Sequence, residues 1–150
     1  MTEREKRVQW FQNARFGMFL HWGLYAIPGR GEWYMSEAKI PAEQYEQYMQ
    51  EFTAKAYDPR DWARRAKRAG MQYVVLTAKH HDGFCLFDSK LTDYKSTNAP
   101  CGRDLVREFV DAVRAEGLRV GLYYSLIDWH HPDFPKYNDC NHPMRGDPAY

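Results

Sequence analysis

The feature that most constrains this chain is the alternation of short apolar runs with amphipathic stretches. The apolar runs span residues 16–20, 73–79 and 120–125. Short continuous apolar runs are typical of strands, and the first is expected to be covered on both faces. Because helical patterns separate the runs, the sequence predicts an α/β fold with a parallel sheet and right-handed crossovers.

Three helices are expected between these strands. The first begins at Pro41, and the second begins after Asp58, a helix-capping residue followed by proline. Gly70 and Gly117 are placed to end the second and third helices in the left-handed conformation. Each helix has one apolar stripe. The stripes are Tyr45, Tyr48, Met49 and Phe52; Trp62, Ala66 and Ala69; and Leu105, Val106, Phe109, Val110 and Val113.

Composition excludes several classes of function. The chain has 21 basic and 20 acidic residues, a net charge of +1. Such a balance gives no field to attract nucleic acid or an anionic membrane. The cysteines, Cys85, Cys101 and Cys140, form no C-x-x-C pair, so neither a redox motif nor a structural zinc site is indicated. No signal peptide or membrane span is visible, and a cytoplasmic protein is expected.

Polar and aromatic residues follow each predicted strand. They are His21 and Trp22 after the first, His80, His81 and Asp82 after the second, and Tyr123, Tyr124, Ser125, Asp128 and Trp129 after the third. The carboxyl ends of parallel strands converge on one face, where ligands bind. The pattern therefore predicts a shared ligand site there, and coincidental loop or packing residues are the alternative.

The chemistry of these groups favours a carbohydrate. Imidazole, carboxylate and phenol groups donate and accept hydrogen bonds, and tryptophan offers an apolar face to a sugar ring. A metal held by His21, His80 and His81 is the rival, although adjacent side chains at a strand end are expected to diverge. Nucleotide-binding glycine motifs are absent. There is no G-x-S-x-G elbow, and no base is evident beside Ser125.

Three motifs carry a resemblance to a known family. Residues 16–23 (FGMFLHWG) with 31–34 (GEWY), residues 78–84 (AKHHDGF) and residues 121–129 (GLYYSLIDW) occur in order along the chain. They resemble α-L-fucosidases of the retaining glycoside hydrolase family 29. The resemblance covers nearly the whole chain and implies a TIM-like (β/α)8 barrel. An eight-stranded barrel needs roughly 250 residues. Residues 1–150 are therefore expected to be its amino-terminal portion, a partial barrel with the first three parallel strands.

The resemblance also implies a fucose pocket. Its residues would be His21, Glu32, Trp33, His80, His81 and Tyr123. The histidines and Glu32 would hydrogen-bond sugar hydroxyls, and Trp33 would shape the pocket wall. The alternative is a solvated loop acid for Glu32 and core packing for Trp33 and Tyr123. Asp82, Cys85 and Trp129 are expected to support the loops, and no cofactor is implied.

No catalytic residue is assigned. Retaining glycosidases use a carboxylate nucleophile and a carboxylic acid/base. In this family the nucleophile follows the next strand in a Trp-x-Asp context, and no such motif follows the third strand here. The chain alone is therefore expected to be inactive, with exposed sheet edges that favour self-association or a complementing chain. The alternatives are a non-catalytic sugar-binding or assembly fragment and a metal hydrolase on the same barrel.

Overall fold

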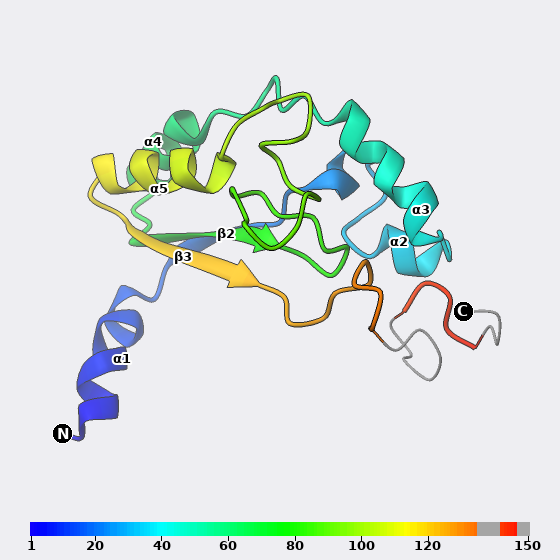
Figure 1. Ribbon diagram of the computed structural model, residues 1–150. Coiled ribbons are helices and arrows are strands. Elements are labelled where there is room, and N and C mark those ends of the chain that lie inside the picture. Colours follow the sequence, from blue (N-terminus) through cyan, green and yellow to red (C-terminus); the bar gives the residue numbers. More distant parts are fainter. Residues whose placement is uncertain (135–141, 147–150) are drawn as a thin grey trace.

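A three-stranded parallel sheet organises the molecule, as the sequence predicts. The computed structural model describes residues 1–134 and 142–146. The strands are β1 (Gly17–Leu20), β2 (Tyr73–Lys79) and β3 (Arg119–Tyr124), hydrogen-bonded in the order β1-β2-β3. Both pairs are parallel, so the α/β class is confirmed (Figure 1).

Helices fill the connections and the amino terminus. They are α1 (Glu3–Ala14), the 3₁₀ helix η1 (Leu24–Ala26), α2 (Tyr34–Glu37), α3 (Ala42–Tyr45), the 3₁₀ helix η2 (Glu46–Glu51), α4 (Pro59–Arg68) and α5 (Leu105–Ala115). The expected helix after Pro41 is thus split into a short α-helix and a 3₁₀ helix. Residues 23–39, which connect β1 with the region of this helix, contain η1 and α2. No helix in the described part of the chain is long and apolar enough to cross a membrane.

The crossover helices begin and end where the sequence predicts. The Asp58 carboxylate caps α4 by accepting the backbone N–H of Asp61 at 2.9 Å. The chain leaves α4 through Gly70, whose φ of +84° suits glycine, and leaves α5 through Gly117 at +68°. One stripe assignment is wrong, because Ala69 is exposed whereas Ala63 is buried with Ala66.

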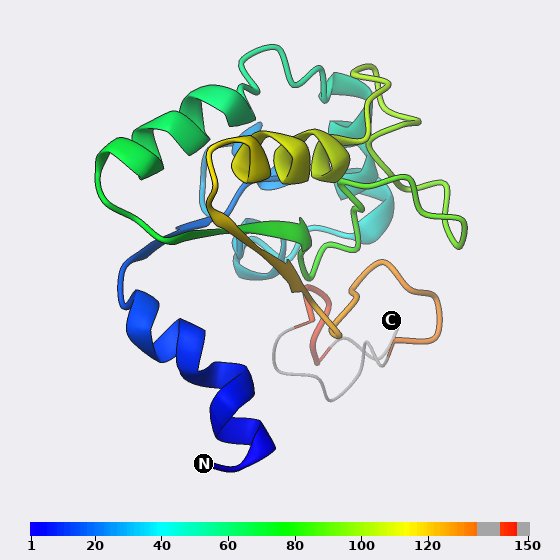
Figure 2. The same ribbon diagram turned by 90° about the vertical axis from the view of Figure 1, so that its left-hand side faces the viewer.

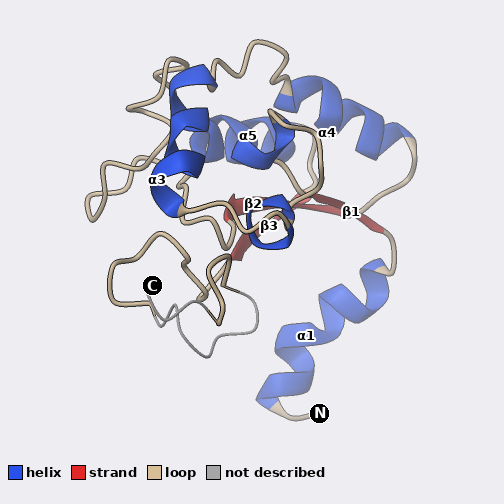
Figure 3. Ribbon diagram, turned by 90° about the vertical axis from the view of Figure 1, so that its right-hand side faces the viewer, coloured by secondary structure: helices blue, strands red, loops and turns tan. Residues whose placement is uncertain are grey.

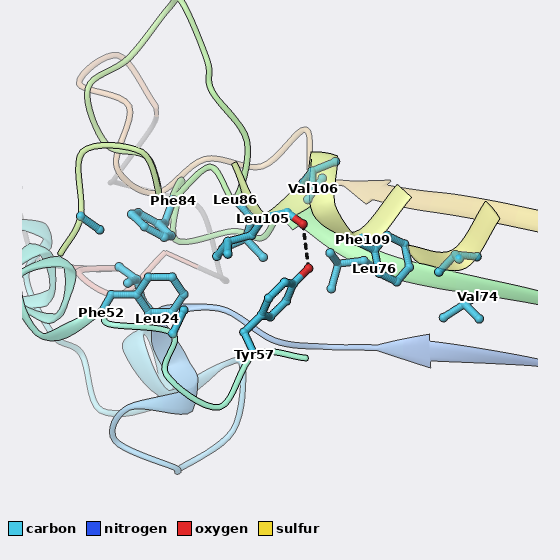
Figure 4. Packing of buried hydrophobic residues seen from close by; sticks show 14 of the residues in the cluster. Leu24, Phe52, Tyr57, Val74, Leu76, Phe84, Leu86, Leu105, Val106 and Phe109 are labelled. Carbon is cyan, nitrogen blue, oxygen red and sulfur yellow. Dashed lines mark hydrogen bonds between the residues drawn. The ribbon is translucent and has the colours of Figure 1, made fainter. Parts of the chain in front are cut away.

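The core lies between the sheet and helices α4 and α5. These two helices cover the same face of the strands (Figures 1 and 2). Val74 and Leu76 of β2 are fully buried together with Phe109 of α5 (Figure 4). The Tyr57 hydroxyl donates to the Leu105 carbonyl oxygen at 2.7 Å, which satisfies a polar group inside this cluster.

The outer strands are less covered than expected. Phe19 of β1 is 52% exposed, and Leu122 and Tyr124 of β3 are 49% and 54% exposed. The expectation that the first strand is covered on both faces is therefore wrong, since α4 and α5 cover the same single face of the sheet. This exposure agrees with the expected open sheet edges.

Helix α1 is absent from the sequence-based expectation. The Thr2 hydroxyl accepts the Glu5 backbone N–H, and the Glu5 carboxylate accepts the Thr2 backbone N–H, which forms a capping box. The helix buries no residue of its own and projects from the amino-terminal end of the sheet (Figure 1). Trp10 and Phe11 contact the Tyr73 ring.

The opposite end of the sheet gathers the connecting segments. Figure 3 looks onto the carboxyl ends of the strands, near which α2 and α3 lie, whereas α1 lies at the far end. The segment after β3 also passes this end (Figure 1). The residues that follow each of the three strands therefore lie together at the carboxyl-terminal end of the sheet.

Candidate functional site

Aromatic and imidazole rings from all three strands meet at this end of the sheet. The His21 ring lies 5.5 Å from the His80 ring, and both rings lie 6.0 Å from the Tyr123 ring, between centroids. His80 and His81 follow β2, and their rings are 4.3 Å apart. Residues distant in sequence thus form one continuous ring cluster.

Trp33 reaches this cluster from the segment before α2, and Glu32 precedes it in the chain. The Trp33 ring lies 4.9 Å from the His81 ring and 6.5 Å from the His80 ring. Burial raises the pKa of the Tyr25 hydroxyl above its ordinary value, and the nearby charge of Glu32 adds to the increase. The Tyr25 ring is 5.4 Å from the His80 ring, so Glu32 is connected with the cluster only through this electrostatic effect on Tyr25.

A buried threonine fixes the end of β1 against β2. The Thr77 hydroxyl donates to the Trp22 carbonyl oxygen at 3.0 Å and accepts the Trp22 backbone N–H at 3.1 Å. Its single proton is thereby used, so the Tyr25 hydroxyl donates to the Thr77 oxygen at 3.1 Å. These bonds hold the turn that carries His21.

His80 is a neutral imidazole at physiological pH. Burial lowers its pKa to about 3, and the neighbouring His81 and His21 contribute to the decrease. Its Nδ1 is buried and has no hydrogen-bond partner among the described residues. A neutral imidazole presents one donor and one acceptor, which is the pairing a sugar hydroxyl can satisfy.

His81 is held by the segment that follows β3. Its Nδ1 lies 2.6 Å from the Ser125 Oγ, and its backbone oxygen accepts the Trp129 N–H at 2.7 Å. The Trp129 ring is fully buried 5.2 Å from the imidazole, which agrees with its expected supporting role. The sequence shows no imidazole beside Ser125, and the fold brings His81 there from 44 residues away.

A partly buried ion pair joins β2 to the segment after β3. The Lys79 Nζ lies 2.8 Å from the Asp128 Oδ2, and only 4% of the lysine side chain is exposed. The Asp128 Oδ1 accepts the backbone N–H groups of His130 and His131 at 3.1 Å. Gly83 turns with φ +82°, and a Cβ there would lie 2.5 Å from the Asp128 carboxylate.

Asp82 is the second acid in this region. Burial raises its pKa to about 7, and the charge of Asp128 adds to the increase, whereas the Phe84 N–H and Lys79 oppose it. The Asp82 Oδ1 accepts the Phe84 N–H at 3.2 Å, and its Oδ2 is buried without a partner among the described residues. A carboxyl group in this setting supports the loop.

The structure corrects one argument against a metal site. His80 and His81 do not diverge, because their rings are 4.3 Å apart. Within residues 1–134 and 142–146, no group of three or more histidine, cysteine, aspartate or glutamate residues is arranged to hold a metal ion. Cys85 and Cys101 are free thiols, and Cys140 lies outside the described residues.

The structure also gives anchoring contacts to four residues that the sequence does not assign to the pocket. Tyr25 and Thr77 anchor the first turn, and Lys79 and Ser125 anchor the second. Their only signal in the sequence is proximity to a strand end. A cavity of about 600 Å³ lies elsewhere, beside α4 and α5, and residues such as Tyr57, Arg64 and Glu108 line it.

Known proteins that are similar to this chain in sequence or structure are described as fucosidases. The tissue alpha-L-fucosidase of Rattus norvegicus is 40% identical over 141 residues, which are 83% of this chain and 30% of the rat protein. Alpha-L-fucosidase isoenzyme 1 from Paenibacillus thiaminolyticus superposes with a TM-score of 0.93 at 66% identity, covering 95% of this chain and 34% of that one. The Thermotoga maritima alpha-fucosidase in complex with fucose gives a TM-score of 0.75 at 40% identity, covering 81% and 35%.

The chain thus spans about a third of the length of these relatives. The Alpha-L-fucosidase family model matches residues 1–147, nearly the whole chain. The resemblance carried by the three strand-end motifs is therefore confirmed. The chain belongs to the alpha-L-fucosidase family.

Proposed function

We propose that this chain forms the sugar-recognition side of an α-L-fucosidase active site. The whole protein would hydrolyse terminal α-L-fucosyl linkages of glycans or glycosides with retention. The sheet would be the first three strands of a (β/α)8 barrel, and residues 1–150 would be an amino-terminal portion of that domain. The observation that carries this proposal is the cluster of His21, His80, His81, Tyr123 and Trp33 at the strand ends.

The chemistry of the cluster supports a fucose ligand. Neutral His80 can donate and accept one hydrogen bond each, and Glu32 adds acceptors. The Trp33 ring lies against the histidines as a wall that a sugar C–H face can contact. The Thermotoga maritima relative is described in complex with fucose, which is the ligand class proposed for this chain.

The catalytic carboxylates are proposed to lie outside the described residues. Retaining hydrolysis needs two carboxyl groups about 5–5.5 Å apart that both reach the sugar. Asp82 is buried within a loop, and the Asp128 carboxylate is engaged by Lys79 and two backbone N–H groups. Neither acid is therefore assigned as nucleophile or as acid/base.

The first test uses the chain by itself. Incubation with an aryl α-L-fucoside is expected to give no turnover, because Asp82 is buried and the Asp128 carboxylate is paired with Lys79. Titration with L-fucose, followed by NMR shift changes at the imidazoles, is expected to show weak binding. Turnover that survives purification would contradict the proposed division between recognition and bond cleavage.

The second test supplies the remainder of the barrel. The matching amino-terminal third of the Paenibacillus thiaminolyticus relative is replaced with this chain, which is 66% identical to it. Hydrolysis of the aryl fucoside is expected, and His80→Ala or His81→Ala should weaken fucose binding by about tenfold or more through the lost hydrogen bonds. Leu126→Ala, at a position that is 92% exposed, is the control. Unchanged affinity in both histidine variants would remove them from the pocket.

A non-catalytic sugar-binding or assembly fragment is the second candidate. The half-exposed apolar side chains of β1 and β3 favour it, because open sheet edges promote association with another chain. This candidate predicts fucose binding by the chain together with an inactive chimera. Size-exclusion chromatography of the chain, with and without the rest of the barrel, separates self-association from complementation.

A further inference from the structure

We propose that Ser125 is a positioning residue that holds His81 with a proton on Nδ1, and so sets how this histidine can hydrogen-bond. The assignment of the proton follows from the geometry of this chain. Its consequence for sugar recognition rests on the proposed function. The two parts are tested by separate measurements.

The argument begins with the single proton of the Ser125 hydroxyl. Its Oγ lies 2.8 Å from the Ile127 carbonyl oxygen, which can only accept. The serine proton is therefore used in that bond. The His81 Nδ1 lies 2.6 Å from the serine oxygen, which can then only accept a hydrogen bond from it. The hydrogen between these two atoms must belong to the imidazole.

The same geometry excludes Ser125 as an activated nucleophile. In a serine nucleophile paired with histidine, the hydroxyl donates its proton to an imidazole nitrogen that acts as a base. Here the direction is reversed, because the hydroxyl donates to Ile127 and the imidazole donates to the hydroxyl. The serine side chain is also buried, with 3% exposure. The contact therefore serves to orient His81.

The backbone around this contact is fixed at several points. The Ser125 N–H donates to the Lys79 carbonyl oxygen at 3.0 Å, and the Trp129 N–H donates to the His81 carbonyl oxygen at 2.7 Å. The pair between Lys79 and Asp128 closes the same segment onto β2. The rings of Trp33 and Trp129 lie 4.9 Å and 5.2 Å from the imidazole. The ring is thus held in orientation as well as in protonation.

The proton on Nδ1 decides whether His81 donates or accepts the hydrogen bond with a sugar hydroxyl. With Nδ1 protonated, a neutral His81 carries its lone pair on Nε2, so Nε2 is an acceptor. A sugar hydroxyl that meets this nitrogen must donate its proton. Loss of Ser125 would let the proton move to Nε2, which would place a donor where an acceptor is needed. Fixing the tautomer therefore contributes to affinity without any contact between Ser125 and the sugar.

The first measurement needs no ligand. The chain is labelled with ¹⁵N in its histidine rings, and the tautomer of each ring is read from two-bond ¹H–¹⁵N correlation spectra at pH 7.5. His81→Gln identifies the signals of His81 among the six histidines. The expected result is a protonated Nδ1 and an unprotonated Nε2. An unprotonated Nδ1 in the parent chain overturns the proposal, whether or not the Ser125 variants fold.

The variants then test the role of the hydroxyl. Ser125→Ala is expected to shift His81 toward a mixture of tautomers, and Ser125→Thr, which keeps the hydroxyl, should restore the Nδ1–H form. Ser96→Ala is the matched control, since it also removes a buried serine hydroxyl that donates to a carbonyl oxygen, that of Arg103 at 2.7 Å. It should leave the His81 signals unchanged. An unchanged tautomer in folded Ser125→Ala would overturn the proposal.

The second measurement is fucose affinity in the same variants. Ser125→Ala is expected to raise the Kd for L-fucose by about fivefold to tenfold, the loss typical of one hydrogen bond, whereas Ser96→Ala leaves it at the parent value. If the parent chain and the chimera both fail to bind fucose, the proposed function is wrong, and the tautomer measurement still decides the role of Ser125. Normal affinity in Ser125→Ala with a changed tautomer contradicts the recognition step alone.

Discussion

The helix-covered face of the sheet and the carboxyl ends of the same strands bury very different residues. Under α4 and α5, the strand β2 buries Val74 and Leu76 against Phe109. At its end, β2 passes directly into Lys79, His80, His81 and Asp82, all of which are also buried. Burial of apolar groups stabilises the fold, whereas burial of polar groups destabilises it unless each finds a partner.

This difference separates the residues that stabilise the fold from the residues that form the candidate site. The helix face supplies the apolar area that keeps the sheet together. The strand ends hold polar groups in unusual states, such as a histidine whose pKa is about 3 and an aspartate whose pKa is about 7. Such perturbed groups concentrate at functional sites. The three predictions below test the contrast from the largest expected effect to the smallest.

The largest effect is expected at the centre of the helix face. Phe109→Ala removes a fully buried ring and should lower the free energy of unfolding by about 3–5 kcal/mol. Urea denaturation followed by fluorescence measures it. Phe19→Ala is the matched control, because this phenylalanine is 52% exposed and should lose less than about 1 kcal/mol. Similar losses for both variants would show that burial under α4 and α5 adds no more stability than a half-exposed position does.

The next effect concerns the ion pair at the strand ends. Lys79→Met should lower the free energy of unfolding by about 2–3 kcal/mol, because it leaves the partly buried Asp128 carboxylate without its cation. The pair of Lys6 and Glu3 has a similar separation, 2.7 Å, but is exposed. Lys6→Met should therefore change stability by less than about 0.5 kcal/mol. A small effect of Lys79→Met would mean that the pair does not hold the segment after β3.

The sequence predicts much of the fold because its signals are local. Apolar runs and capping residues mark the strands and the helices α4 and α5, and Asp58 and Gly70 act as expected. The helix α1 was missed, because its start is strongly charged and it buries no residue of its own. The sequence also does not predict the partial cover of β1, since periodicity cannot tell a central strand from an outer one.

The candidate site also has a part that the sequence predicts and a part that it does not. The position of His21, His80 and Tyr123 at the strand ends could be predicted, since parallel strands align their carboxyl ends. The contact between Ser125 and His81 could not, because it depends on three-dimensional register. The ladder between β2 and β3 shifts between Thr77 and Lys79, which changes the pairing that a regular strand would give. Pairings of this kind are set by packing.

The last prediction uses the two perturbed groups, whose effects on stability have opposite signs. His80 has a folded pKa of about 3 against an ordinary 6.5, so between these values the unfolded chain binds the extra proton and stability rises with pH. Asp82 has a folded pKa of about 7 against an ordinary 3.8, so the folded chain binds the extra proton and stability falls as pH rises. Between pH 3.8 and 6.5 the two contributions oppose each other.

Two substitutions separate these contributions. Asp82→Asn should make the free energy of unfolding rise more steeply with pH than in the parent, by about 1 kcal/mol per pH unit between pH 4 and 6.5. His80→Gln should change the slope by a similar amount in the opposite direction, and the double variant should return toward the parent profile. Urea denaturation at half-unit pH steps measures all four proteins. Parallel profiles would mean that neither group is buried as the strand-end arrangement requires. The helix-covered face and the strand ends would then differ only in the types of residue they bury. The altered protonation that marks the strand ends as a site would be absent.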